Sequence, residues 1–299
     1  MTDTTQRRST VVSLLIALRP RQWAKNLLVF AAPLAAGQLF QTDVLLPSLG
    51  AFVAFCLISS ATYLVNDVRD VESDRNHPKK CTRPIAAGQV STRLAIATAV
   101  VLAAAALALS LFISLALAGV VVAYAVFTLA YSLALKHEPV IELALLAMGF
   151  LLRAIAGGAA SGLPISQWFL IVAGFGSLFM AAGKRYSELE RSSDADDNGF
   201  RRKSLDGYTL GYLRFVWGVA AAVTITAYAL WAFDVAVKPS SFPWAEWSVL
   251  PFVLAILRYG VSIDRGNAEA PEDTALKDRI LLLLGLAWLV LFALGAVGA

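Results

Sequence analysis

Long apolar runs alternate with short polar segments along almost the whole chain. A helix crosses a bilayer with about 20 apolar residues, and nine runs approach that length. The first run is interrupted by Pro33 and Gly37, which a membrane helix tolerates when its neighbours satisfy the freed backbone groups. The pattern predicts one all-α membrane domain, residues 1–299, with nine transmembrane helices. These lie near 27–45, 47–65, 93–112, 115–135, 139–160, 166–183, 212–233, 247–263 and 279–298.

Positive charge gathers on one side of these predicted spans. If the N-terminal segment 1–21 is cytoplasmic, 23 of the 25 Lys and Arg residues fall in cytoplasmic segments. The exceptions are Lys238, in an outer loop, and Arg153, within a span. Because cytoplasmic loops of membrane proteins are rich in Lys and Arg, we expect a multi-pass protein of the plasma membrane. The long polar loops 67–93 and 184–211 then face the cytoplasm, and we expect the chemistry there.

The composition agrees with a membrane protein. The chain is 58% hydrophobic and 15% charged, whereas soluble domains carry about 25% charged residues. The net charge of +4 is less informative than its distribution along the chain, and no nucleic-acid partner is expected. Cys56 and Cys81 form no metal-ligand pattern and are not expected to form a disulfide. No signal peptide is evident before the first apolar run.

A run of acidic residues closes the second predicted helix, in the segment Asn66-Asp67-Val68-Arg69-Asp70-Val71-Glu72-Ser73-Asp74. If the helix continues, Asn66 and the three aspartates lie within about 100° of arc on one face. Carboxylates this close repel one another unless a cation lies among them. Oxygen ligands suit Mg²⁺, which often bridges to substrate phosphates. The segment predicts a magnesium site, and the alternative is a solvated helix end.

Basic residues follow this acidic segment directly. Lys79, Lys80 and Arg83 lie between Pro78 and Pro84, and the two prolines end the helix. Carboxylates, a metal and nearby cations together suit a diphosphate group. The alternative for these residues is that they only mark the cytoplasmic side.

Two further segments carry candidate phosphate ligands. Lys184 and Glu188, at the end of the sixth predicted span, have the spacing of a helix-surface ion pair. The other interpretation is that Lys184 and Arg185 contact phosphate while Glu188 assists a metal. Lys136, after the fourth span, is a possible third phosphate contact.

Arg153 is the one ionisable residue deep within a span. It lies about 16 Å deeper than Glu142 at 1.5 Å per residue. A charge at such depth is costly and suggests a function. It meets either an anionic lipid headgroup or helix carbonyl groups, and the sequence favours neither.

Taken together, these segments resemble the UbiA-type intramembrane prenyltransferase superfamily, which shares the N-D-x-x-D-x-x-x-D pattern at the end of a second helix. More specific segments are similar to the branch that transfers phosphoribose to a polyprenyl phosphate. The similarity extends over nearly the whole chain. The specific segments are R-P-R-Q-W-A-K-N (19–26), 63–74, R-P-I-A-A-G (83–88), L-K-H (135–137), R-A-I-A-G-G (153–158) and G-K-R-Y (183–186).

This resemblance implies transfer of 5-phosphoribose from phosphoribosyl diphosphate to decaprenyl (polyprenyl) phosphate for cell-wall arabinan synthesis, with release of diphosphate and inversion at C1. The lipid tail would lie in a groove open to the membrane. Asp67, Asp70 and Asp74 would be catalytic. Mg²⁺ would be held by Asn66, Asp67, Asp70, Asp74 and Glu188. Phosphates would be contacted by Lys25, Arg83, Lys136, Lys184, Arg185 and Tyr186.

One departure and two alternatives remain at this stage. Superfamily members carry a second aspartate-rich motif near the end of the sixth helix, where this chain has Lys184-Arg185-Tyr186-Ser187-Glu188. The number of metals is therefore open, as are the isoprenoid length and the oligomeric state. One alternative is ordinary prenyl transfer to a small acceptor. The other is a lipid transporter, which would show an inverted repeat, and the sequence contains no strong repeat.

Overall fold

The computed structural model describes residues 9–78, 80–194, 205, 207–235, 242–268, 274 and 276–297. All regular elements within this part of the chain are helices, as the sequence predicts. Some of the residues that we assigned to a side of the membrane lie outside the described residues, as does part of the loop 184–211. They are Arg7, Arg8, Lys79, Arg201, Arg202 and Lys203 on the cytoplasmic side and Lys238 on the outer side.

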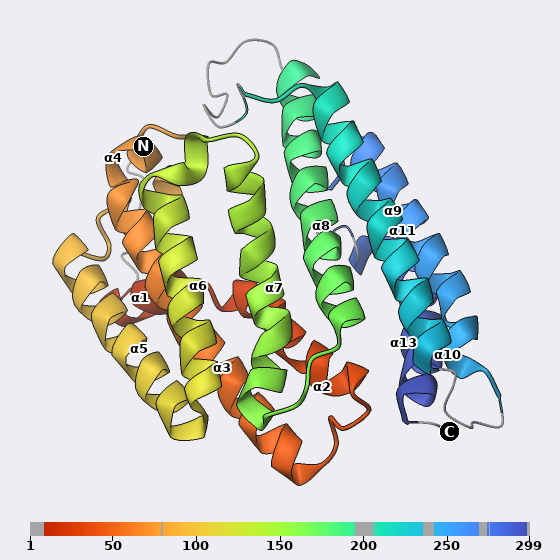
Figure 1. Cartoon of the computed structure of the whole chain (residues 1–299). Helices are drawn as coiled ribbons and strands as arrows, with labels where there is room; N and C mark the ends of the chain where they lie inside the picture. Colours follow the sequence, from red (N-terminus) through yellow and green to blue (C-terminus); the bar gives the residue numbers. More distant parts are fainter. Residues whose placement is uncertain are drawn as a thin grey trace.

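Seven helical segments in the described part are long and apolar enough to cross a membrane. The last described helix is α13 (Arg279–Val297), whose apolar stretch Arg279–Gly295 is shorter than these seven. Figure 1 shows α7 in the middle of the bundle, between α3, α5 and α6 on one side and α8, α9 and α11 on the other. The seven are α3 (Thr42–Arg69), α5 (Thr92–Ile113), α6 (Leu115–Leu133), α7 (Ile141–Ser161), α8 (Gln167–Asp194), α9 (Leu210–Val235) and the pair α10 (Trp244–Trp247) and α11 (Val249–Asp264).

The prediction of one continuous helix over 27–45 is wrong. The chain forms a 3₁₀ helix, η1 (Pro20–Phe30), then the short α2 (Ala31–Ala35). It turns at Gly37, whose φ is 68°, a value that glycine adopts without strain. This irregular segment packs closely against α7. The approach is so close that a Cβ atom at Gly157 would collide with the backbone oxygen of Val29. The described residues therefore do not show nine continuous spans.

Arg153 lies at the centre of the bundle and ties three segments together. Its guanidinium donates to Asn26 Oδ1 of η1 at 2.7 Å, to the Gly149 carbonyl at 2.6 Å and to Tyr124 Oη of α6 at 2.7 Å. The charge also lies 4.7 Å from the centroid of the Tyr124 ring, which stabilises a cation in an apolar environment. Arg153 is 5% exposed. Of the two interpretations of this residue, the structure describes the one in which it bonds helix carbonyls and neighbouring side chains.

Serine residues set the ends of the neighbouring helices. The side chain of Ser91 accepts the N–H of Leu94 where α5 begins. Ser114 alone links α5 to α6, accepts the N–H of Leu117 at 3.0 Å and donates to the Ala159 carbonyl at 2.8 Å. Such caps satisfy N–H groups that have no partner within the helix.

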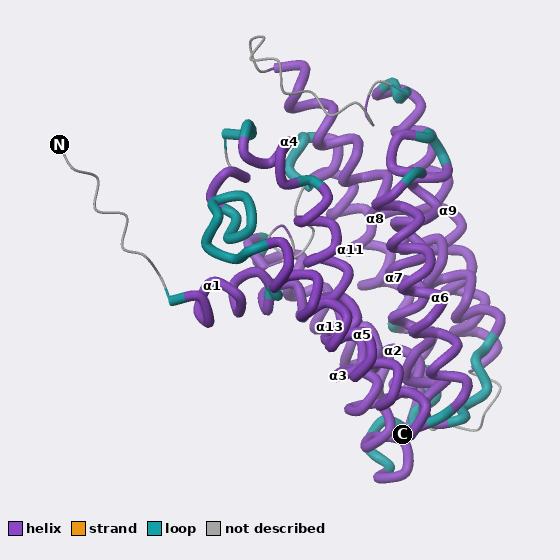
Figure 2. The backbone as a smooth tube through the Cα atoms, turned by 90° about the vertical axis from the view of Figure 1, so that its left-hand side faces the viewer, coloured by secondary structure: helices purple, strands orange, loops and turns teal. Residues whose placement is uncertain are grey.

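A short helix, α1 (Thr10–Ala17), leads into the site. Figure 2 shows it projecting sideways from the bundle. Its buried Ser13 donates to Gln89 Oε1 at 3.0 Å, while Val11 and Leu15 are exposed. Arg19 follows with φ 57° and ψ 58°, a left-handed conformation that is uncommon outside glycine.

Candidate active site

The acidic segment forms the end of α3 and the short α4 (Val71–Arg75). The N–H of Asp70 bonds the Asn66 carbonyl and the N–H of Asp74 bonds the Asp70 carbonyl, so the helical repeat continues through the junction. Asp67 is 3% exposed and Asp74 is 2% exposed. Buried carboxylates of this kind require charge partners.

Arg83 supplies the shared partner of these two carboxylates. Its Nη1 lies 3.1 Å from Asp67 Oδ1 and 2.6 Å from Asp74 Oδ2. Arg19 Nη2 contacts the same oxygen, Asp67 Oδ1, at 2.5 Å. Lys80 Nζ, at the start of η2 (Lys80–Thr82), lies 3.8 Å from Asp74 Oδ1. Two carboxylates therefore meet around one guanidinium nitrogen.

The third aspartate is held from a different segment. Lys136, in the short η3 (Leu135–His137), places its Nζ 3.0 Å from Asp70 Oδ1. Arg69 reinforces this junction by donating to the Ser132 carbonyl near the end of α6. The structure thus joins Asp67, Asp70, Asp74 and the nearby Arg83 to Lys136, which lies more than 50 residues further along the chain.

Arg19 is the partner that the sequence analysis did not assign to the site. The only available signal was its place in the R-P-R-Q-W-A-K-N segment. Its guanidinium also lies 5.0 Å from the centroid of the Tyr63 ring, one turn before Asp67. Arg19 therefore belongs with the site residues.

Lys25 lies deeper in the bundle. It is half-buried in η1, and its neighbour Trp23 donates to Ser60 Oγ at 3.0 Å. Ser60 is about 10 Å from Asp67 along α3, at 1.5 Å per residue. The contact between Lys25 and a phosphate stays a prediction.

The charges at the acidic segment are neutralised within the protein. Among the described residues, no group of three or more His, Cys, Asp and Glu side chains could hold a metal ion. The donors still suit magnesium, because Asp67 and Asp74 present oxygens to one common cation, the Arg83 nitrogen. For a metal to take that place, the guanidinium must move away. The magnesium ligands Asn66, Asp67, Asp70, Asp74 and Glu188 stay a prediction.

Arg185 occupies a closed environment rather than an open phosphate site. It is 1% exposed, and its Nε and Nη2 each lie 2.8 Å from an oxygen of the fully buried Glu142. It also donates to Tyr131 Oη at 3.0 Å and contacts Glu188. A two-point pair of this kind fixes the guanidinium, so Arg185 could reach a phosphate only if the pair opened.

Tyr186 and Lys184 also differ from the arrangement that we expected. Tyr186 is 2% exposed, and its hydroxyl accepts from Arg214 at 2.7 Å. Lys184 Nζ lies 4.0 Å from Glu188 Oε1. This is the helix-surface ion pair that the spacing of the two residues allows. The basic cluster on α8 therefore packs α7, α8 and α9 together in the structure as described.

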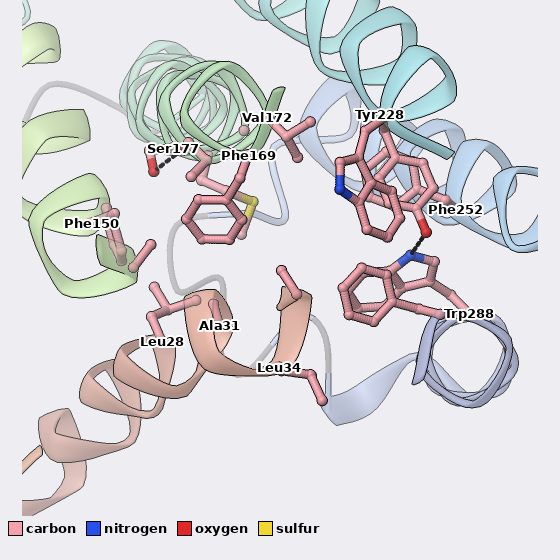
Figure 3. A pocket seen from close by; sticks show the side chains of 17 residues that line it. Leu28, Ala31, Leu34, Phe150, Phe169, Val172, Ser177, Tyr228, Phe252 and Trp288 are labelled. Atoms are coloured by element: carbon pink, nitrogen blue, oxygen red, sulfur yellow. Dashed lines mark hydrogen bonds between the residues drawn. The ribbon is translucent and has the colours of Figure 1, made fainter. Parts of the chain in front are cut away.

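An apolar pocket of about 340 Å³ opens among α2, α7, α8, α9, α11 and α13. Figure 3 shows Phe150 and Phe169 on one side and Tyr228, Phe252 and Trp288 on the other. Trp288 Nε1 donates to Tyr228 Oη at 2.8 Å and so fixes this aromatic wall. The pocket suits an extended hydrocarbon.

Comparison with known proteins gives consistent matches. Residues 26–284 match the UbiA prenyltransferase family. The decaprenyl-phosphate phosphoribosyltransferase of Mycobacterium tuberculosis is 50% identical over 286 residues, which cover 93% of this chain and 92% of that protein. The enzyme of the same name from Corynebacterium glutamicum is 49% identical over 280 residues, covering 91% and 83%.

Two solved structures share the fold. A UbiA homologue from Archaeoglobus fulgidus bound to GPP and Mg²⁺ superposes with a TM-score of 0.69 at 18% identity, covering 96% of this chain and all of that one. A structure of digeranylgeranylglyceryl phosphate synthase gives a TM-score of 0.67 at 17% identity, covering 97% and 99%.

Proposed function

The chain belongs to the UbiA prenyltransferase family, and we propose that it transfers 5-phosphoribose from phosphoribosyl diphosphate to decaprenyl (polyprenyl) phosphate with release of diphosphate. The observation that carries the proposal is near 50% identity to decaprenyl-phosphate phosphoribosyltransferases over more than nine-tenths of the chain. The site supports it, because Arg19, Arg83 and Lys136 contact three aspartates. A donor with two phosphate groups needs such a mixture of charges.

The physical problem in this reaction is the departure of diphosphate from the ribose C1 carbon. That carbon becomes cationic while negative charge grows on the leaving oxygens. Magnesium, when bound by Asn66, Asp67, Asp70 and Asp74, would supply charge neutralisation at those oxygens. A structural relative solved with GPP and Mg²⁺ bound supports magnesium as the metal.

The protein's own cations complete the charge balance. Arg19 and Arg83 are paired with aspartates in the structure. Guanidinium binds carboxylate and phosphate alike, so both would exchange a carboxylate for a phosphate once magnesium takes their place at the aspartates. Lys136 acts as a point charge. The acceptor is already an anion, so no proton must be removed. Attack opposite the leaving group gives inversion at C1.

The acceptor's tail would enter the apolar pocket of Figure 3. A cavity of 150 Å³ admits one benzene molecule, so a pocket of about 340 Å³ accommodates about two or three isoprene units. The rest of the chain would lie in the bilayer. The distribution of Lys and Arg favours a site at the cytoplasmic side of the plasma membrane.

The test is a donor assay on the purified full-length protein in detergent. It combines radiolabelled phosphoribosyl diphosphate, decaprenyl phosphate and magnesium, with and without EDTA, and counts label in the organic phase. We expect lipid-linked label that EDTA abolishes. Turnover of a prenyl diphosphate with a small acceptor, without transfer of phosphoribose, would instead support the broader prenyltransferase function of the family.

A further inference from the structure

The loop that carries Lys136 to the acidic segment ends in a strained turn. Val140 has φ 67° and ψ −52°, and the N–H of Ile141 donates to the Pro139 carbonyl at 2.8 Å. These values define a γ-turn of the rare, strained kind. A β-branched residue in this region is an outlier, and such a conformation persists only when its surroundings hold it.

Tyr208 and Gly207, from the segment before α9, hold this turn. The N–H of Val140 donates to Tyr208 Oη at 2.7 Å. Tyr208 is 4% exposed and its ring stacks on Tyr212, with centroids 5.9 Å apart. A Cβ atom at Gly207 would collide with Pro139, so the absence of a side chain permits the close approach. Burial raises the pKa of Tyr208 to about 12, which keeps the hydroxyl neutral.

The turn lies between two charge contacts of the site region. Four residues before Val140, Lys136 reaches Asp70. Two residues after it, Glu142 binds Arg185. If the turn relaxed, the η3 segment would lose its fixed end, and the Lys136 ammonium would no longer be directed at the acidic segment.

We propose that Tyr208 is a positioning residue: by accepting the Val140 N–H, it holds the strained turn and thereby directs Lys136 toward the donor's phosphates. The inference rests on the proposed function, because Lys136 needs a fixed position only if it meets a donor phosphate. Strain retained next to a ligand-binding charge is the arrangement expected at a functional site.

We call the hydrogen bond from the Val140 N–H to Tyr208 Oη the clamp. It is tested by hydrogen exchange of the peptide that covers residues 136–142. Tyr208→Phe removes the acceptor oxygen and keeps the ring, and Tyr212→Phe is the matched control on the stacked neighbour. Loss of one neutral hydrogen bond should make the Val140 amide exchange about fivefold faster in Tyr208→Phe. The control should exchange like the unmodified protein. Unchanged exchange in Tyr208→Phe would overturn the clamp.

The effect on Lys136 is tested by calorimetric binding of phosphoribosyl diphosphate and magnesium, without the lipid acceptor. Tyr208→Phe should weaken binding about fivefold, and in a Lys136→Ala background it should have no further effect, because contacting groups are not additive. Equal weakening in both backgrounds would overturn the positioning role. If the unmodified protein binds no phosphoribosyl diphosphate, the proposed function and the link to Lys136 both fail, and hydrogen exchange still decides whether the clamp exists.

Discussion

A single nitrogen of Arg83 contacts two buried carboxylates, those of Asp67 and Asp74. The charge balance of the site therefore depends on few side chains. Asp67 has two cationic partners, Arg83 and Arg19. Glu72, in the same segment, is exposed and is not among the residues that form these ion pairs in the described part of the chain. The two residues therefore provide a matched pair for testing the site.

At the residue scale, we expect Asp67→Asn to lower phosphoribosyl transfer by at least about 100-fold, since losing one preorganised charge partner at a reacting centre has effects of this size. The amide keeps the shape of the side chain, so the protein should still purify as a folded species. Glu72→Gln should leave transfer unchanged. Transfer by Asp67→Asn close to that of the unmodified protein would contradict the assignment.

Arg185 and Glu142 permit a second test at this scale, which separates packing from phosphate binding. Arg185→Met should lower the free energy of unfolding by about 3–5 kcal/mol, because it leaves Glu142 as an uncompensated buried charge. The double variant Arg185→Met with Glu142→Leu should recover most of that loss in thermal unfolding in detergent.

Activity of the double variant then decides the role of Arg185. A packing role predicts that transfer returns together with stability. A stable double variant that transfers no phosphoribose would mean that Arg185 contacts a phosphate after all, through an opening of the buried pair.

At the scale of single elements, hydropathy identified the apolar segments but not their internal geometry. The first predicted span failed because its shape depends on Gly157, more than a hundred residues later, and on Arg153, which draws Asn26 into the bundle. A pattern of local apolar residues contains no such information. In contrast, the boundary between the predicted spans 93–112 and 115–135 is confirmed, because α5 ends at Ile113 and α6 begins at Leu115, after the capping residue Ser114.

This dependence predicts a specific sensitivity of η1. Gly157→Ala should lower the free energy of unfolding by about 1–3 kcal/mol, the range for overpacked positions, because the new methyl group forces Val29 away from α7. Gly119→Ala, in α6, adds a methyl group with nothing within 4 Å and should not destabilise the protein. Thermal unfolding of both variants in one detergent provides the comparison. Equal stability would show that η1 can shift freely.

The candidate site divides in the same way between what local sequence reveals and what it does not. The spacing of Asp67, Asp70 and Asp74 predicted a charged face, and the structure places cations on all three. The sequence could not show that Arg185 faces Glu142, because that pairing depends on how α7 and α8 pack. Arg19 was missed for a related reason. The direction of its side chain follows from a left-handed backbone conformation, which the sequence does not reveal.

At the scale of the whole molecule, the sidedness of the protein is still a prediction from its charges. The two cysteines offer a direct test, since Cys81 lies in η2 beside the site, whereas Cys56 is 6% exposed within α3. A membrane-impermeant maleimide should label inside-out vesicles and not intact cells, and Cys81→Ser should abolish the signal. Labelling of intact cells would place the site on the outer face.

The pocket of Figure 3 joins the first and last parts of the chain, with Leu34 on α2 and Trp288 on α13 among its walls. During synthesis, α2 leaves the ribosome some 250 residues before α13. Contacts between segments so distant in the sequence form late in folding, and folding during synthesis starts from the N-terminus. The aromatic wall that would receive the lipid tail is therefore assembled only after the final helix has inserted, so a nascent or truncated chain can carry every charged residue of the site and still lack a place for its acceptor.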